Sequence, residues 1–127
     1  MKAWCLVKRS LMQVYVKNSR EAVEIYKKAF DAQLVAEYMN DDGQYMHAEL
    51  EVQGQIIALS EINGQAIAGN NMQFCFHYGK GNEAAVEKAY KILKDGGEVT
   101  YPLGECPFSP LMTGLTDKFG ISWCLFV

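Results

Sequence analysis

The stretch Arg20-Glu-Ala-Val-Glu-Ile-Tyr-Lys-Lys-Ala-Phe30 has a close counterpart later in the chain, Glu83-Ala-Ala-Val-Glu-Lys-Ala-Tyr-Lys-Ile-Leu93. In both stretches apolar residues recur at positions i, i+1, i+4, i+7 and i+8, which is the pattern of one face of an amphipathic helix. Two helices are therefore predicted. Because their sequences match, they indicate an internal duplication.

Segments typical of β-strands surround each predicted helix in the same order. They alternate between apolar and polar residues or are rich in β-branched and aromatic ones, and they cover residues 11–16, 34–40, 45–52 and 55–61, then 72–78, 98–103, 111–116 and 122–126. The segment 62–71, rich in Asn, Gln and Gly, is expected to join the two halves. Residues 105–110 are expected to be irregular, because Pro107 and Pro110 cannot donate backbone hydrogen bonds.

The predicted order of elements is βαβββ, twice. It predicts an α+β fold in a single domain over residues 1–127, with two repeats over about residues 10–61 and 71–127. In each repeat the helix can cover one face of a mainly antiparallel sheet and leave the other face for a cavity or a partner. The two sheets together are expected to form a cup.

Composition and charge exclude several classes of protein. The chain has 12 Lys and Arg against 15 Asp and Glu, and its net charge of −3 gives no general attraction to nucleic acid. No apolar run approaches the ~20 residues of a membrane span, so no membrane association is expected. Residues 1–7 are followed by Lys8 and Arg9, too early for a signal-peptide core, and a cytoplasmic location is expected.

The four cysteines are Cys5, Cys75, Cys106 and Cys124, and they form no C-x-x-C pair and show no zinc-ribbon spacing. They are expected to be reduced thiols that pack as small hydrophobic residues. The sequence places no cation or helix N-terminus beside Cys75 or Cys124, so it does not favour a nucleophilic role for either thiol.

Three motifs carry a resemblance to a known family. They are Val16-Lys-Asn-Ser-Arg-Glu-Ala-Val-Glu-Ile-Tyr-Lys-Lys-Ala-Phe30, Met46-His-Ala-Glu-Leu50 and Asp117-Lys-Phe-Gly-Ile-Ser-Trp123. With the doubled βαβββ order, the chain resembles the vicinal oxygen chelate superfamily, which includes glyoxalase I, bleomycin-resistance proteins and extradiol dioxygenases. Within it the chain resembles the PhnB-like branch, often labelled demethylubiquinone-methyltransferase-like. The resemblance implies a glyoxalase-like cup, a divalent metal held by His or Glu from four strands, and a homodimer.

The positions that correspond to those metal ligands hold other residue types. Counting from the loop and turn positions puts Leu11, Ala58 and Cys124 at three sites, and Asn71 or Gln73 at the fourth. Leucine and alanine cannot ligate an ion, and a lone cysteine beside an amide suits a hard divalent ion poorly. The sequence therefore predicts that the metal centre and its cofactor ion are absent.

Strand alternation predicts what lines the cup instead. Met46, Ala48, Leu50 and Val52 are expected to face the helix, which turns Tyr45, His47, Glu49 and Glu51 toward the cup. Similarly, Phe74, Phe76 and Tyr78 are expected on the helix side. The candidate ligand-binding residues are Gln13, Tyr15, His47, Glu49, Ala58, Ser60, Gln73, Cys75, His77 and Cys124. Each also has a plainer interpretation, as a solvated strand residue or as a packed thiol.

Three functional hypotheses follow. The first is a metal-free protein of the PhnB-like branch that binds a small, partly polar molecule in the cup. The second is a metal-dependent lyase, isomerase or dioxygenase-type enzyme whose ligands have moved to His47, Glu49 or His77. The third is a structural interaction module whose cup is filled by its own aromatic residues. The sequence decides neither whether the protein is an enzyme nor which molecule it binds.

Overall fold

The computed structural model describes residues 6–127, so Cys5 lies outside the described residues. Within them, two helices and eight strands follow the predicted order. The first module consists of β1 (Met12–Val16), α1 (Ser19–Phe30), β2 (Gln33–Met39), β3 (Tyr45–Val52) and β4 (Gln55–Glu61). The second module consists of β5 (Phe74–His77), α2 (Glu83–Leu93), β6 (Glu98–Cys106), β7 (Ser109–Thr116) and β8 (Ser122–Phe126).

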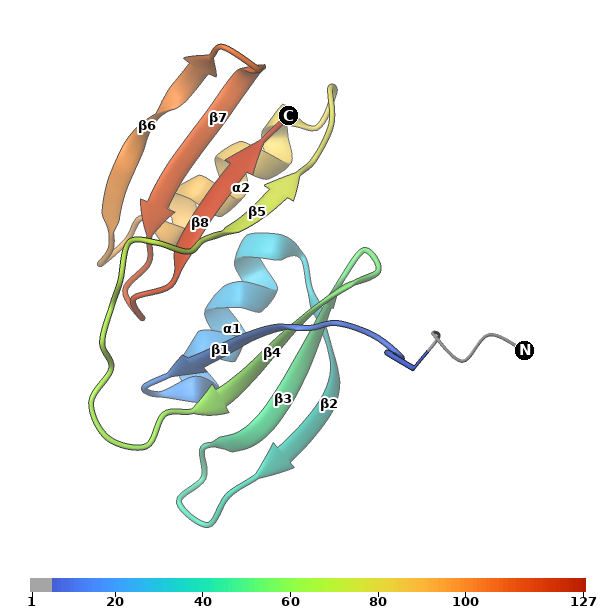
Figure 1. Cartoon of the computed structure of the whole chain (residues 1–127), viewed down its shortest axis with the longest axis vertical. Coiled ribbons are helices and arrows are strands. Elements are labelled where there is room, and N and C mark those ends of the chain that lie inside the picture. The colour runs from blue at the N-terminus through green and yellow to red at the C-terminus, as the bar shows by residue number, and fades with distance from the viewer. Residues whose placement is uncertain (1–5) are drawn as a thin grey trace.

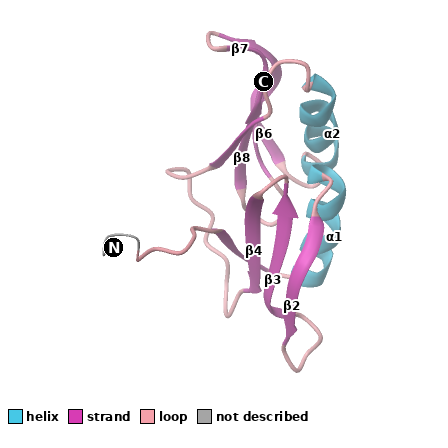
Figure 2. Cartoon of the chain, turned by 90° about the vertical axis from the view of Figure 1, so that its right-hand side faces the viewer, coloured by secondary structure: helices cyan, strands magenta, loops and turns pink. Residues whose placement is uncertain are grey.

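Each module forms its own four-stranded sheet, in the orders β1-β4-β3-β2 and β5-β8-β7-β6. The first strand of each module runs parallel to the last one, and the other neighbours are antiparallel. The modules lie one above the other in Figure 1, and Figure 2 shows both helices on the same side of the molecule. We call the face of each sheet that is turned away from the helix its helix-distal face. The predicted α+β fold of two βαβββ modules is confirmed.

The main hydrophobic core extends through both modules. The predicted apolar stripe of α1 is buried, and α1 packs against α2 as well as against β3 and β4. The ring of Phe30, at the end of α1, lies 4.9 Å from the ring of the fully buried Trp123 on β8. Neither helix in residues 6–127 is long and apolar enough to span a membrane.

The buried Asp117 carboxylate joins the two modules through hydrogen bonds. The hydroxyl of Tyr26 on α1 and the indole Nε1 of Trp123 both donate to its Oδ2, at 2.6 and 2.9 Å. Its Oδ1 accepts the backbone N–H groups of Phe119 and Ile121 at 2.9 and 3.0 Å. The motif Asp117–Trp123 therefore shapes the turn before β8 and anchors α1 to the second module.

The irregular stretch predicted over residues 105–110 is wrong. There β6 and β7 form a hairpin with a two-residue turn, and Cys106 lies opposite Ser109. Pro107 occupies the turn, where its missing N–H is not needed. Pro110 falls where the register between the strands shifts, so its missing N–H removes no regular ladder bond.

The alternation predicted for the start of β3 is also wrong. Tyr45 is only 6% exposed and lies in the core, whereas Met46 is 62% exposed. The register between β2 and β3 shifts between the pairs Tyr38–His47 and Met39–Tyr45, so β3 contains one extra residue there. Such a bulge reverses the alternation on one side of it, and the predicted alternation holds from His47 onward.

Candidate functional site

The structure divides the ten predicted site residues between two sheets. Six lie on the first sheet, with Gln13 and Tyr15 on β1, His47 and Glu49 on β3, and Ala58 and Ser60 on β4. Three lie on the second sheet, with Cys75 and His77 on β5 and Cys124 on β8, and Gln73 immediately precedes β5. We call the residues of the first sheet the first group and the others the second group; Gln13 and Tyr15 of the first group and Gln73 of the second line one pocket together.

The first group is centred on the Glu49 carboxylate, which is buried although it lies on the helix-distal face. Arg9 donates two hydrogen bonds to it, from Nη1 to Oε1 at 2.8 Å and from Nη2 to Oε2 at 2.9 Å. The Nε2 of His47 lies 2.8 Å from Oε2. Because a carboxylate only accepts, this nitrogen carries a hydrogen, and in the neutral imidazole Nδ1 keeps its lone pair.

Electrostatics keep Glu49 ionised. The hydrogen bonds from Arg9 and then from His47 lower the pKa of Glu49 to about 2, although burial acts in the opposite direction. The guanidinium balances the buried negative charge, and about half of the Arg9 side chain remains exposed. Sequence reasoning missed Arg9, because it precedes the strands and nothing local indicates its partner.

Tyr38 borders this charged centre, and Tyr15 lies on the edge strand β1 of the same sheet. Tyr38 is 62% exposed, lies opposite His47 on the neighbouring strand, and has its ring 6.2 Å from the imidazole. Tyr15, also largely exposed, lies opposite Ser60, whose hydroxyl accepts a hydrogen bond from Gln13 at 3.1 Å. Ala58 is fully buried beneath this surface and so cannot contact a ligand directly. The carboxylate of Glu49 and the imidazole of His47, which can exchange protons, thus lie near the aromatic ring of Tyr38.

Strand register shows which residues lie opposite the predicted ligand positions Ala58 and Cys124. Opposite Ala58, β1 presents Gln13, whereas Leu11 lies just before the strand. Opposite Cys124, β5 presents Cys75, rather than Asn71 or Gln73. The four register positions therefore hold an amide, a methyl group and two thiols, a set that does not fit a hard divalent ion. Among residues 6–127, no three His, Cys, Asp or Glu side chains lie close enough to hold a metal.

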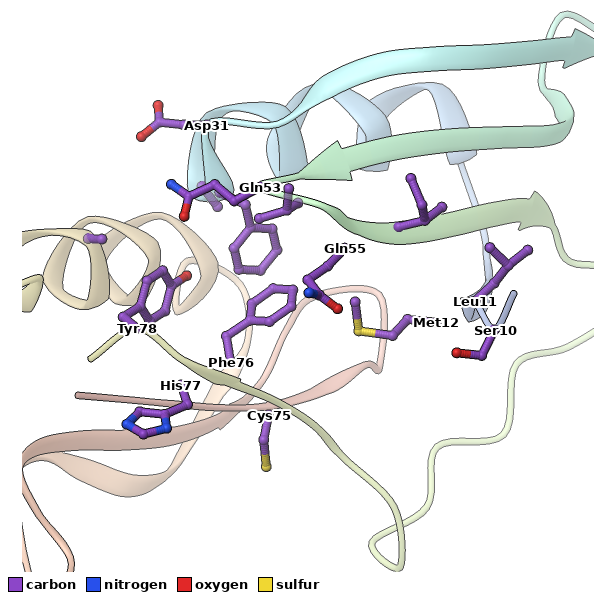
Figure 3. A pocket seen from close by; sticks show the side chains of 15 residues that line it. Ser10, Leu11, Met12, Asp31, Gln53, Gln55, Cys75, Phe76, His77 and Tyr78 are labelled. Carbon is purple, nitrogen blue, oxygen red and sulfur yellow. The ribbon is translucent and has the colours of Figure 1, made fainter. Parts of the chain in front are cut away.

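The second group is more apolar. Figure 3 shows Cys75 and His77 on one side of β5, with Phe76 and Tyr78 on the other, as the alternation predicted. The imidazole of His77 stacks on Phe126 with ring centroids 4.5 Å apart, and its Nε2 lies 3.0 Å from the backbone oxygen of Val127. His77 is thereby fixed by packing and does not approach His47 or Glu49.

The thiols of this group differ from one another. Burial, and then the neighbouring Cys75, raise the pKa of Cys124 to about 11, so this thiol is protonated and unreactive at neutral pH. Cys106 is buried with it. Cys75 is exposed, and the expectation that it packs as a buried residue is therefore wrong. The three thiols thus differ in access rather than forming one reactive cluster.

Comparison with known proteins places this geometry in a family. Residues 9–125 match the sequence model of the Glyoxalase/Bleomycin resistance protein/Dioxygenase superfamily. No match was found among the curated proteins.

Solved structures share the fold at low sequence identity. The PhnB protein from Bacillus cereus has a TM-score of 0.80 and 23% identity, covering 94% of this chain and 98% of that chain. Protein PA1353 from Pseudomonas aeruginosa has a TM-score of 0.79 and 21% identity, covering 94% and 97%.

A third structure is the genomically encoded fosfomycin resistance protein FosX from Listeria monocytogenes. It has a TM-score of 0.71 and 12% identity, covering 95% of this chain and 93% of that chain. Because the family model covers nearly the whole chain and the fold agrees, the chain belongs to the Glyoxalase/Bleomycin resistance protein/Dioxygenase superfamily.

Proposed function

We propose that the protein binds a small molecule on the helix-distal face of its first sheet, around Glu49, and does so without a divalent metal. The observation that carries this proposal is the Glu49 carboxylate, which is only 8% exposed and is held by Arg9 and His47. Small-molecule sites combine apolar and aromatic walls with a few well-placed polar groups, which is the composition of this surface. Strongly perturbed acids are also enriched at functional sites.

The surroundings of Glu49 indicate the kind of ligand. Tyr38 and Tyr15 offer exposed aromatic rings, against which a flat part of a ligand can pack. The exposed half of Arg9 and the free Nδ1 of His47 offer a charged donor and an acceptor. A small, partly polar molecule with a ring or another flat group suits this combination.

Residue chemistry supports the metal-free form of the proposal. The predicted ligand positions Ala58 and Cys124 have Gln13 and Cys75 opposite them in the neighbouring strands. Of the relocated candidates, His77 lies on the other sheet, so only His47 and Glu49 come together. Both oxygens of Glu49 are already bonded to Arg9, so an ion would have to displace a charge-assisted pair. The metal-dependent alternative therefore has less support than binding alone.

A thermal-shift screen of small polar and aromatic metabolites tests the proposal. We expect at least one compound to raise the Tm of the wild-type protein and to lose that effect in Glu49→Gln and in Tyr38→Ala. Tyr38 is largely exposed, so its variant keeps the fold even where Glu49→Gln is unstable. Glu98→Gln, an exposed carboxylate in the second module, is the matched control and should keep the effect.

Two results would contradict the proposal. The first is that no compound in a broad set stabilises the protein. The second is that compounds stabilise both Glu49→Gln and Tyr38→Ala as much as the wild type. Elemental analysis of protein purified without chelators tests the alternative, which requires stoichiometric zinc, nickel, manganese or iron.

A further inference from the structure

A cleft of 410 Å³ lies between the two modules, away from the Glu49 surface. Its walls come from the end of α1, the turn between β3 and β4, the segment before β1, and β5 (Figure 3). Small-molecule sites occupy clefts of this size and often lie between structural units. Two of the ten predicted site residues, Cys75 and His77, also line it.

The most informative group in the cleft is the Tyr78 hydroxyl. It is buried and is the one buried side-chain polar atom in residues 6–127 that has no hydrogen-bond partner. Leaving such a hydroxyl unpaired destabilises a protein, so native structures rarely retain one without a reason. Burial, and then the charge of Asp31, raise the pKa of Tyr78 to about 12, so the hydroxyl keeps its proton and can donate.

A second, independent observation comes from the turn that faces Tyr78. Gln53 and Gly54 join β3 to β4 as a two-residue turn, with φ of 46° and 88°. Such turns favour Asn-Gly, because a larger side chain in the left-handed region is strained. The turn places Gln53 at the cleft, and Figure 3 shows its amide on the side of the cleft that faces Tyr78. Backbone strain that persists in a fold is often associated with a binding function.

The remaining lining narrows the chemical class of the ligand. Gln55 contributes a second amide, and no hydrogen bond found in residues 6–127 uses the side chain of Gln53 or Gln55. Phe30 and Phe76 supply an apolar wall, with ring centroids 5.2 Å apart and an angle of 84° between the rings. Among the described residues, the one lining side chain with a full charge at neutral pH is Asp31, whose largely exposed carboxylate pairs with Lys88. An anion would therefore find no countercharge among these groups.

We propose that this cleft binds an uncharged, planar ring compound that accepts a hydrogen bond from the Tyr78 hydroxyl and pairs with the amide of Gln53 or Gln55. The aromatic wall contacts the ring, the hydroxyl gains the partner that it lacks, and the two amides can both donate and accept. The cleft shares none of the residues of the Glu49 surface, so either site can fail without the other.

Titration of the wild-type protein with 2-quinolone, isatin and benzamide tests this inference, with amide NMR spectra to locate the contacts. At least one of these uncharged rings should shift the side-chain signals of Gln53 or Gln55. Quinoline-2-carboxylate, an anion on a similar ring, should bind at least about tenfold more weakly. Tyr78→Phe should weaken binding of the uncharged ring about threefold to tenfold, the effect of one net hydrogen bond.

The stability of the free protein distinguishes this account from a structural role for the hydroxyl. Because the hydroxyl lacks a partner, Tyr78→Phe should leave the Tm unchanged or raise it. Tyr90→Phe on α2, outside the cleft lining, is the matched control and should leave both Tm and binding unchanged. The inference is overturned if none of the three rings binds at millimolar concentration, if Tyr78→Phe binds them as tightly as the wild type, or if Tyr78→Phe lowers the Tm by several degrees.

Discussion

Arg9 and Glu49 form a bidentate ion pair, with hydrogen bonds of 2.8 and 2.9 Å, although 40 residues separate them in the sequence. The pair joins the segment before β1 to the middle of β3 and neutralises a carboxylate that lies on the helix-distal face of the first sheet. Its geometry gives two parallel, charge-assisted hydrogen bonds, which are stronger than neutral ones. We therefore expect the stability of the first module, and the ligand binding proposed above, to depend on this pair.

Glu49→Gln should destabilise the protein in a pH-dependent way. The pKa of Glu49 is lowered to about 2 in the folded protein, below its usual value in an unfolded chain, about 4.3. The stabilisation is therefore fully present above the unfolded pKa and is lost as the pH falls toward 2. Urea unfolding at pH 7 should show a loss of about 1–3 kcal/mol for Glu49→Gln, with a smaller loss at pH 3. Equal losses at both pH values would contradict this account.

Asp117→Asn should destabilise the whole protein, because the carboxylate accepts hydrogen bonds from both modules. An amide nitrogen cannot accept. It would replace either Oδ2, the acceptor of both Tyr26 and Trp123, or Oδ1, the acceptor of two backbone N–H groups. We expect a loss of about 2–4 kcal/mol in the free energy of unfolding, measured by urea denaturation. Glu105→Gln, an exposed carboxylate in β6, is the control and should change stability by less than about 0.5 kcal/mol. A similar small effect for Asp117→Asn would show that Asp117 does not join the modules.

The cysteines should differ in their reaction with iodoacetamide at pH 8. Burial raises the pKa of Cys124 to about 11, so very little of it is thiolate and access is restricted. Cys75 is exposed and should be alkylated first. Peptide mass spectrometry at timed intervals measures both rates, and protein unfolded in urea, where both thiols are accessible, serves as the control. Faster labelling of Cys124 than of Cys75 in the folded protein would refute the assignment.

Exposed apolar residues on the first sheet agree with the homodimer that the family resemblance implies. Tyr15, Tyr38 and Met46 are all more than half exposed. Tyr15 and Tyr38 lie on the two edge strands of the sheet, whose backbone groups are free to pair, and exposed apolar residues often mark an interface. Sedimentation at micromolar concentration should therefore show a dimer, and Met46→Glu should shift it toward monomer. A monomeric wild-type protein would remove this expectation.

Much of the fold follows from local patterns in the sequence. The helical stripes that begin at Ala22 and Ala85 repeat with the period of an α-helix, and the duplicated order of elements follows from them. The reversed orientation of Tyr45, which is buried, and Met46, which is exposed, could not be predicted in this way. It results from one extra residue in the pairing of β2 with β3, and pairing is a property of two strands together.

The site was less predictable than the fold, because it depends on contacts between distant segments. Alternation placed His47 and Glu49 on the same face, which is correct, since it is a local property of β3. Counting from turns does not give the residues that lie opposite Ala58 and Cys124, because register depends on strand pairing. Arg9 could not be found in this way, because it precedes the strands and its contact with Glu49 spans 40 residues.

The most direct test of the central claim is a calorimetric titration with a compound that stabilises the protein in the screen. It is performed on protein as purified, after dialysis against EDTA, and after addition of Mn²⁺, Ni²⁺ or Zn²⁺. If the Glu49 surface binds a small molecule without a metal, the Kd is the same in all three cases. Loss of binding on chelation, with recovery when one of these ions is returned, would contradict the claim.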